Sequence, residues 1–383
     1  MMQGLAMQQL PISPQLLAHL DHCLDCRNCE HVCPAGVEYE NLLDTTRYWL
    51  KQQHVSLSPK GKISQRAGNL LSQPQHLRRL NNLLWLYQSS GLQWLLDKTG
   101  ILRLLRLDYV ASLLPRLQRT TRFPTTYEVS APRGRIALFT GCLGSTLEQA
   151  TIKASLEVLH KLGLNVEILP TQTCCGALAW HEGDNESAMQ FAQQNLQAFD
   201  PLQVDAILYT ASGCGAHLVK YKDLPWHSDT ERDQATAFTS KLKEISAYLE
   251  ELEWPAETQF RRQQQRIAVH EPCSERNGLR QTNVTKTLLS RIPDLDVETL
   301  SGTQCCGAAG NYMLKHPEMA SKLRTDKLDQ IKQLDVDLVV STNPGCSLFL
   351  NAGLERHTRL KVVHPVIVLA EYLLAESDTP SRI

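Results

Sequence analysis

An internal repeat of cysteines is the feature of this sequence that most restricts its fold. Four cysteines recur in the same order 131 or 132 residues later, and each copy contains an adjacent pair followed by glycine. Two spaced thiols can arise by chance, but four thiols repeated in register indicate two copies of one structural unit, each with its own thiolate site. The first set is Cys142, Cys174, Cys175 and Cys214, and the second is Cys273, Cys305, Cys306 and Cys346.

The other four cysteines form a different pattern near the N-terminus. Cys23, Cys26, Cys29 and Cys33 are followed by Pro34 and read C-x2-C-x2-C-x3-C-P. This is the bacterial ferredoxin spacing, in which one short loop brings its sulfurs to the irons of a cluster. It is the most specific cofactor signal in the chain, and it predicts a 4Fe-4S cluster.

Disulfide bonds and structural zinc are the alternatives to iron-sulfur binding. Residues 1–22 lack the basic segment, continuous apolar stretch and cleavage site of a secretory signal, so we expect reduced cysteines and a cytoplasmic protein. Zinc stays open, because four thiolates suit zinc as well as iron. Adjacent cysteines fit badly around one tetrahedral ion but suit neighbouring irons, which favours iron-sulfur centres in the repeats and leaves zinc as the alternative.

Composition excludes several functions. The chain has 383 residues, of which 39 are basic and 40 are acidic. Its net charge of −1 provides no positive electrostatic field that would attract nucleic acid. It has no run of about 18 uncharged apolar residues, which excludes a membrane-spanning helix. It also lacks a glycine-rich dinucleotide fingerprint, a P-loop and a G-x-S-x-G motif. We therefore assign no catalytic residue and expect flavin or nucleotide chemistry to occur in other proteins.

Hydrophobic patterning predicts an α/β fold in which helices alternate with strands in both repeats. Each cysteine follows the carboxyl end of an expected strand, where ligand sites lie in open parallel sheets. We expect strands at 135–140, 165–169, 206–210, 266–270, 296–300 and 338–342, and helices at 39–50, 147–162, 186–198, 242–252 and 366–375. The expected segments are a ferredoxin-type segment (1–55), a helical linker domain (56–133, with connections at 56–74 and 120–133), and two cysteine-rich units (134–255 and 264–378).

Two further features have open interpretations. Leucines recur at helical spacing over 76–117, with interruptions at Gly91 and Gly100; we expect a buried face, with docking to a partner or membrane surface as the alternative. His181, His217 and His270 lie within six residues of a cysteine. Because histidines are common in this chain, we expect them to be surface or supporting groups rather than ligands.

Five segments carry a resemblance to a known family. The repeated units resemble the CCG cysteine-rich domains of heterodisulfide reductases and their relatives, and their fusion to a ferredoxin motif is similar to the glycolate oxidase iron-sulfur subunits. The resemblance covers essentially the whole chain and implies a helical ferredoxin-type domain followed by two tandem α/β CCG repeats. The segments are HLDHCLDCRNCEHVCPAGVEYENLLD (19–44), TASGCGAHLVKY (210–221), HEPCSERNG (270–278), CCGAAGNYML (305–314) and TNPGCSLFLNAG (342–353).

The resemblance implies an electron-transfer subunit. FAD-binding partner subunits would oxidise glycolate or a related 2-hydroxy acid, and electrons would pass through this chain toward the quinone pool or another respiratory acceptor. Cys23, Cys26 and Cys29 would ligate one cluster, Cys33 the same or a neighbouring one, and the eight repeat cysteines further iron-sulfur or metal centres. The location would be cytoplasmic, with the cytoplasmic face of the inner membrane as the alternative. The alternative hypotheses are a disulfide- or quinone-reducing subunit of the heterodisulfide reductase or anaerobic glycerol-3-phosphate dehydrogenase type, and a zinc-stabilised scaffold.

Two departures from the family pattern affect the cofactors. The family has two ferredoxin loops and this sequence has one, so we expect a second loop upstream of Met1, and a second 4Fe-4S cluster, in the full-length protein. Relatives with an unusual non-cubane cluster end each repeat in C-x-x-C, whereas Ala211 and Asn343 stand where that additional cysteine would be. The cluster type in the repeats is therefore left open.

Overall fold

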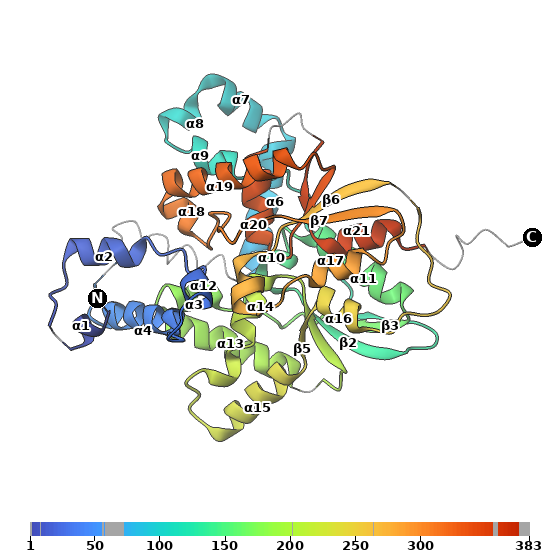
Figure 1. Cartoon of the computed structure of the whole chain (residues 1–383), viewed down its shortest axis with the longest axis horizontal. Coiled ribbons are helices and arrows are strands. Elements are labelled where there is room, and N and C mark those ends of the chain that lie inside the picture. Colours follow the sequence, from blue (N-terminus) through green and yellow to red (C-terminus); the bar gives the residue numbers. More distant parts are fainter. Residues whose placement is uncertain are drawn as a thin grey trace, which may run out of the picture.

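A computed structural model describes residues 2–7, 9–55, 57, 73–200, 202–262, 264–354 and 359–374. It consists of two α/β units side by side, a group of short helices formed by the N-terminal segment, and a helical arm (Figure 1). The α/β class predicted from the sequence is confirmed. Most of the expected connection at 56–74 lies outside the described residues.

The first unit is built on a five-stranded sheet with the order β1-β3-β2-β4-β5. The four strands from β2 onward run parallel, and β1 pairs antiparallel with β3 through Thr126 and Glu167. Its strands are β1 (Thr126–Tyr127), β2 (Gly134–Phe139), β3 (Leu164–Glu167), β4 (Ala206–Tyr209) and β5 (Leu242–Glu244). Its helices are α10 (Gly141–Gly144), α11 (Gln149–Lys161), α12 (Ala177–His181), α13 (Asn185–Phe199), α14 (Ser212–Leu218), η1 (Tyr221–Asp223), α15 (Asp229–Ser240) and α16 (Ile245–Glu251).

The second unit repeats this topology in a four-stranded parallel sheet with the order β7-β6-β8-β9. The order matches β3-β2-β4-β5 of the first unit, as the cysteine repeat predicts. Its strands are β6 (Gln265–Val269), β7 (Leu295–Thr299), β8 (Leu338–Val340) and β9 (Val362–Val363). Its helices are η2 (Ser274–Gly278), α17 (Val284–Leu289), α18 (Tyr312–Lys315), α19 (Pro317–Gln333), α20 (Pro344–Asn351) and α21 (Pro365–Tyr372).

Three short strands correct the sequence-based expectations. The expected linker at 120–133 contributes β1 to the first sheet, and the expected helix at 242–252 begins as β5 before it becomes α16. Strand β9 likewise precedes α21, and the last residue expected in that helix lies outside the described residues. Strands of two or three residues are too short to show the alternation by which strands are recognised in a sequence.

Alternation along the strands divides each unit into two faces. Ile136 and Leu138 of β2 and Ile267 and Val269 of β6 belong to one apolar core that both units share. Helices α11, α16, α17 and α21 pack together in this core. The opposite face of each sheet borders a separate apolar cluster that contains cysteines. The shared core thus fixes the two units against each other, and the cysteines lie on the faces that point away from it.

The N-terminal segment packs around its own small core. It contains α1 (Met2–Ala6), α2 (Pro14–Asp21), α3 (Asn28–His31) and α4 (Tyr39–Gln52), the last of which confirms the helix expected at 39–50. The core consists of Leu5, Leu16, Leu20, Leu43 and Leu50.

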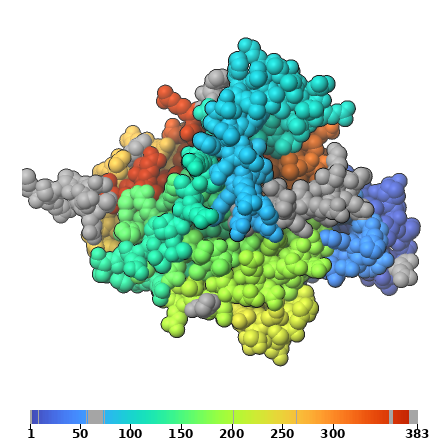
Figure 2. All heavy atoms as spheres, turned by 180° about the vertical axis from the view of Figure 1, so that it is seen from behind, coloured from blue at the N-terminus to red at the C-terminus, as the bar shows by residue number. Residues whose placement is uncertain are grey.

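The leucine-rich segment forms an arm that extends from the body of the molecule (Figures 1 and 2). It comprises α6 (Pro74–Ser89), α7 (Leu92–Thr99), α8 (Ile101–Leu104) and α9 (Asp108–Ser112). Gly91 and Gly100 interrupt it with φ values of 79° and 73°, which glycine adopts readily.

The expectation that the leucines of this arm form a buried face is wrong. Among the described side chains of α6–α9, Leu102 is the one apolar side chain that is buried. In contrast, Leu104 is 83% exposed and Trp94 is 63% exposed. Periodicity identifies an apolar face but does not say what covers it.

A buried polar pair lies where the two units meet. Glu244 and His364 occupy corresponding positions as N-caps of α16 and α21, and their side chains lie 3.8 Å apart. Burial raises the pKa of Glu244 to about 8 and lowers that of His364 to about 3, so at neutral pH both side chains are largely uncharged. Nε2 of His364 donates a hydrogen bond to the carbonyl of Thr210, which ties α21 to the first unit.

Replacing Glu244 by glutamine should stabilise the protein in a pH-dependent way. The folded state keeps the Glu244 proton up to about pH 8, whereas the unfolded chain loses it near pH 4.5, so wild-type stability falls between these values. Glu244→Gln removes that loss and should gain roughly 2–4 kcal/mol at pH 8 and little at pH 4. Denaturant unfolding across this range measures the gain, with Glu253→Gln on the surface as the control. A gain that does not change with pH would contradict the assignment.

The arm offers a second test of the fold. Leu102→Ala should destabilise it by about 2–3 kcal/mol, because a buried leucine leaves a cavity. Leu104→Ser should change stability by no more than about 0.5 kcal/mol, because its side chain is exposed. Hydrogen exchange of the amides in α7–α9 measures both. Equal losses of protection would show that Leu104 is packed in solution.

Candidate iron-sulfur and cysteine-rich sites

The four thiols of the first repeat form a connected chain at the carboxyl ends of its strands. Cys142 lies in α10 after β2, Cys174 and Cys175 precede α12, and Cys214 lies in α14 after β4. Hydrogen bonds join the thiols of Cys142 and Cys174, and the Cys175 thiol contacts those of Cys174 and Cys214. These contacts, with burial, raise the pKa of Cys142 and Cys175 well above the ordinary value. Because metal binding deprotonates such thiols, the arrangement suits a metal centre.

The second repeat arranges its thiols in the same way. Hydrogen bonds connect Cys273 to Cys305, Cys305 to Cys306, and Cys306 to Cys346. The Sγ atoms of Cys306 and Cys346 lie 2.9 Å apart. Contact with Cys305 and burial raise the pKa of Cys273 well above its usual value. The structure therefore brings together each set of four cysteines that the sequence repeat groups.

The glycine after each cysteine pair has a structural reason. Gly176 and Gly307 have φ values of 85° and 91°, and their N–H groups donate to the sulfurs of Cys174 and Cys305 at 3.4 Å. A Cβ atom on Gly307 would lie 2.6 Å from the carbonyl oxygen of Ala320. Hydrogen bonds of this kind to sulfur tune the potential of an iron-sulfur centre.

The spread of the sulfurs bears on the choice between a cluster and a single ion. In the part of the chain that the structure describes, neither set of four thiols has all its sulfurs within 4.8 Å of one another. A tetrahedral zinc ion with Zn–S bonds of about 2.3 Å needs sulfurs about 4 Å apart. In the structure, the sulfurs of each set therefore form an extended chain and not a compact tetrahedron.

The cysteines of the ferredoxin-type loop differ in their exposure and in the direction of their pKa shifts. Cys23 and Cys26 are half-buried, which raises their pKa, and Cys29 is exposed. The pKa of Cys33 is lowered by backbone N–H groups, chiefly that of Val37. The N–H of Asp25 donates to Cys23 Sγ at 3.5 Å. The loop thus provides four thiols with N–H donors nearby, a donor set that fits an iron-sulfur cluster.

This loop packs directly on the second repeat. The side-chain amide of Asn277 donates to the carbonyl of Cys26 at 2.7 Å, and that of Asn28 donates to Thr303 Oγ1 at 3.1 Å. Burial is the main cause of the raised pKa of Cys26, and electrostatic repulsion from the nearby Cys273 adds to it. The N-terminal thiols and those of the second repeat are therefore neighbours.

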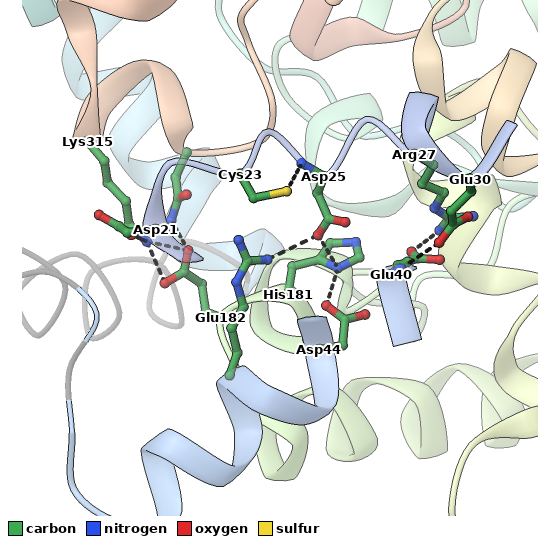
Figure 3. Close-up of polar contacts among 12 residues, drawn as sticks. Asp21, Cys23, Asp25, Arg27, Glu30, Glu40, Asp44, His181, Glu182 and Lys315 are labelled. Atoms are coloured by element: carbon green, nitrogen blue, oxygen red, sulfur yellow. Dashed lines mark hydrogen bonds and ion pairs between the residues drawn. The ribbon is translucent and has the colours of Figure 1, made fainter. Parts of the chain in front are cut away.

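Buried ion pairs hold the same loop to the first repeat (Figure 3). Glu40 of α4 is 4% exposed and pairs with both Arg27 and Lys220. Asp25 pairs with Arg47 at 3.1 Å and with His181 of α12 at 3.2 Å. Asp25, Glu40 and His181 are close enough to bind a metal, but the two carboxylates already face cations, so this group is an ion-pair network.

A second contact joins both repeats and α2 (Figure 3). Lys315 of the second repeat pairs with Glu182 of the first repeat at 2.5 Å and approaches Asp21 to 4.0 Å. The side-chain amide of Asn311 also donates to Glu182 at 3.0 Å. The N-terminal segment therefore lies against both units at once.

The three histidines singled out from the sequence have different surroundings. Burial lowers the pKa of His181, but the charges of Asp25 and Asp44 outweigh it and the pKa is raised. His217, 2% exposed, lies among the rings of Trp180, His181 and Tyr221, and neither of its ring nitrogens is hydrogen-bonded.

His270 is 4% exposed, and one of its ring nitrogens forms a compact group with the sulfurs of Cys306 and Cys346, all within 4.8 Å of one another. We expected these histidines to be either surface groups or supporting groups. His217 and His270 are buried, so the surface alternative is wrong for these two residues. A position-by-position comparison of the two repeats would have singled out His270.

Comparison with known proteins agrees with this architecture. The cysteine-rich domain family matches residues 136–219 and 267–351, and the family described as the linker region of the glycolate oxidase iron-sulfur subunit matches residues 65–114. The probable glycolate oxidase iron-sulfur subunit of Bacillus subtilis (strain 168) is 33% identical over 363 residues, 92% of this chain and 82% of that protein. The chain belongs to the glycolate oxidase iron-sulfur subunit family.

Other relatives widen the comparison. The glycolate oxidase iron-sulfur subunit of Escherichia coli (strain K12) is 30% identical over 94% of this chain and 83% of that protein. One subunit of the fumarate reductase (CoM/CoB) of Methanothermobacter marburgensis is 29% identical over 59% of this chain and 43% of that protein. Among the residues that the structure describes, no helix is both long and apolar enough to cross a membrane.

The ion pairs of Glu40 lead to a stability prediction. Glu40→Gln removes the charge that faces Arg27 and Lys220, so both cations stay in a half-buried site without their partner. Removing one partner of a buried pair costs about 3–5 kcal/mol. We expect the N-terminal segment to lose protection in hydrogen exchange, whereas Glu38→Gln, at an exposed position just before α4, should leave it unchanged. Equal protection in the two variants would show that the pairs do not hold the segment.

Proposed function

We propose that this chain is the iron-sulfur electron-transfer subunit of a glycolate oxidase complex. In this proposal FAD-binding partner subunits oxidise glycolate to glyoxylate, and the electrons pass through this chain toward the quinone pool or another respiratory acceptor. The observation that carries it is the packing of the ferredoxin-type loop on the second repeat, with Cys26 beside Cys273. Membership of the family supports it.

The residues have separate roles in this proposal. When bound, an iron-sulfur cluster accepts and releases single electrons. Cys23, Cys26 and Cys29 would hold a 4Fe-4S cluster, and Cys33 the same or a neighbouring cluster. The repeat thiols would hold further iron-sulfur centres, with zinc as the alternative. They are Cys142, Cys174, Cys175, Cys214, Cys273, Cys305, Cys306 and Cys346.

The protein around the thiols sets the distances between the three groups of cysteines and supplies hydrogen bonds to their sulfurs. The ion pairs of Glu40 and Asp25 and the hydrogen bond of Asn277 keep the N-terminal loop against both repeats. The N–H groups of Gly176 and Gly307 face sulfur, and such donors stabilise the more negative, reduced state of a centre. Reduced thiols also fit a location in the cytoplasm or at the cytoplasmic face of the inner membrane.

A second candidate function follows from the similarity to the fumarate reductase (CoM/CoB) chain of Methanothermobacter marburgensis. In this alternative, of the heterodisulfide reductase or anaerobic glycerol-3-phosphate dehydrogenase type, a repeat centre itself reduces a disulfide or quinone. The similarity spans 59% of the chain, whereas the match to the glycolate oxidase subunits spans more than nine tenths. We therefore favour electron transfer for a glycolate-oxidising complex.

Loss of one ligand of the N-terminal cluster should separate the two halves of the reaction. In a reconstituted complex, Cys26→Ser should abolish electron transfer from glycolate to a quinone or dye, while glycolate should still reduce the partner's flavin, because flavin reduction precedes transfer to the clusters. Stopped-flow absorbance follows the flavin, and dye reduction follows the complete path.

His31→Ser, at an exposed position between Cys29 and Cys33, is the control and should leave both steps intact. Iron and acid-labile sulfide analysis of the anaerobically purified protein accompanies the assay. A colourless preparation that contains only zinc would overturn the proposal in favour of the zinc scaffold. Loss of flavin reduction in an intact Cys26→Ser complex would show that the protein does more than conduct electrons.

A further inference from the structure

The two cysteine-rich repeats differ at one pair of positions beside their thiols. When the repeats are aligned on their cysteines, His270 corresponds to Phe139 and Ser341 corresponds to Tyr209. Phe139 and Tyr209 belong to the apolar cluster that contains Cys174 and Cys175 of the first repeat. The second repeat therefore has an imidazole and a hydroxyl where the first has two aromatic rings.

Strand geometry places His270 on the face of the sheet that bears the thiols. Val269 belongs to the core shared by the repeats, whereas Ala268 belongs to the cluster that contains Cys306 and Cys346. Because side chains alternate along a strand, His270 falls on the same side as Ala268. A ring nitrogen of His270 and the sulfurs of Cys306 and Cys346 all lie within 4.8 Å of one another.

Ser341 holds the imidazole in an orientation suited to metal binding. Nδ1 of His270 lies 3.0 Å from Ser341 Oγ, and the backbone N–H of Ser341 donates to the carbonyl of Val363 at 2.9 Å. With Nδ1 paired, Nε2 is the nitrogen left for a metal, and metal-binding histidines commonly have their second nitrogen held in this way.

We propose that His270 is a metal ligand of the second repeat, so that this repeat holds a mixed imidazole–thiolate centre while the first holds a thiolate-only centre. The proposal rests on the function proposed above, in which the second set of thiols binds a metal. Iron and zinc share the required chemistry, because both accept thiolate and imidazole ligands. An imidazole brings no negative charge, so an iron centre that uses it in place of a thiolate has a higher reduction potential. The two repeats would then differ in potential despite their common fold.

The chain offers matched variants for the test. His270→Phe gives the second repeat the residue that the first repeat has at this position. His217→Phe is the control, because His217 is also buried and follows a cysteine of the first repeat, and its counterpart in the second repeat is Phe349. Both substitutions introduce a ring that the corresponding position of the other repeat already accommodates, so both variants should fold, as circular dichroism can verify.

The measurement is X-ray absorption at the iron and zinc edges of the anaerobically purified protein, with pulsed EPR of ¹⁴N coupling for paramagnetic centres. We expect a nitrogen ligand in the wild type, its loss in His270→Phe and its retention in His217→Phe. The edge at which nitrogen is lost identifies the metal. A nitrogen ligand that persists in His270→Phe would overturn the proposal, and so would one that disappears only in His217→Phe.

Two further variants keep the result unambiguous. Replacing Cys306 and Cys346 by serine should remove the metal of the second repeat. If the metal content stays unchanged, both this proposal and the proposed second-repeat centre fail; if metal is lost but the nitrogen signal never depended on His270, only this proposal fails. Should His270→Phe not fold, Ser341→Ala decides the question: we expect it to lose metal to a chelator at about 10- to 100-fold lower chelator concentration, and an unchanged value would overturn the proposal.

Discussion

The apolar core shared by the two repeats is the constraint on which the rest of the structure depends. It takes one set of alternate residues from β2 and β6 and buries them among α11, α16, α17 and α21. The other set is thereby directed away from the core, together with the loops that carry the cysteines. A one-residue shift of either strand would exchange the faces and move the thiols out of their sites.

The sequence predicted the parts of this arrangement that repeat or alternate. Two sets of cysteines in register indicated two like units, and the structure has two sheets with the same order of strands and a connected chain of thiols in each. It did not predict β5 and β9, because two or three residues show no alternation. It also did not predict the exposure of Leu104 and Trp94, since a helical stripe of leucines looks the same whether or not another surface covers it.

Contacts between distant segments account for what the sequence left open at the site. Nothing in the spacing of Cys23 to Cys33 indicates that the loop faces the second repeat through Asn277 or the first through His181. These contacts join residues more than 150 positions apart. The pair of Lys315 and Glu182 also joins the two repeats, and it can form only when the shared core has fixed the repeats against each other.

Divergence of the repeats gives a single fold two different sites. The shared core and the glycine after each cysteine pair are common to both, so the geometry of the thiols is similar in the two units. The residues that border the thiols are free of that constraint, and there His270 and Ser341 replace Phe139 and Tyr209. In an electron-transfer chain two identical centres provide no difference in potential between them. Substitutions at the positions beside the thiols can therefore give the two centres different reduction potentials. Such a difference sets the direction of electron transfer, and the fold is kept.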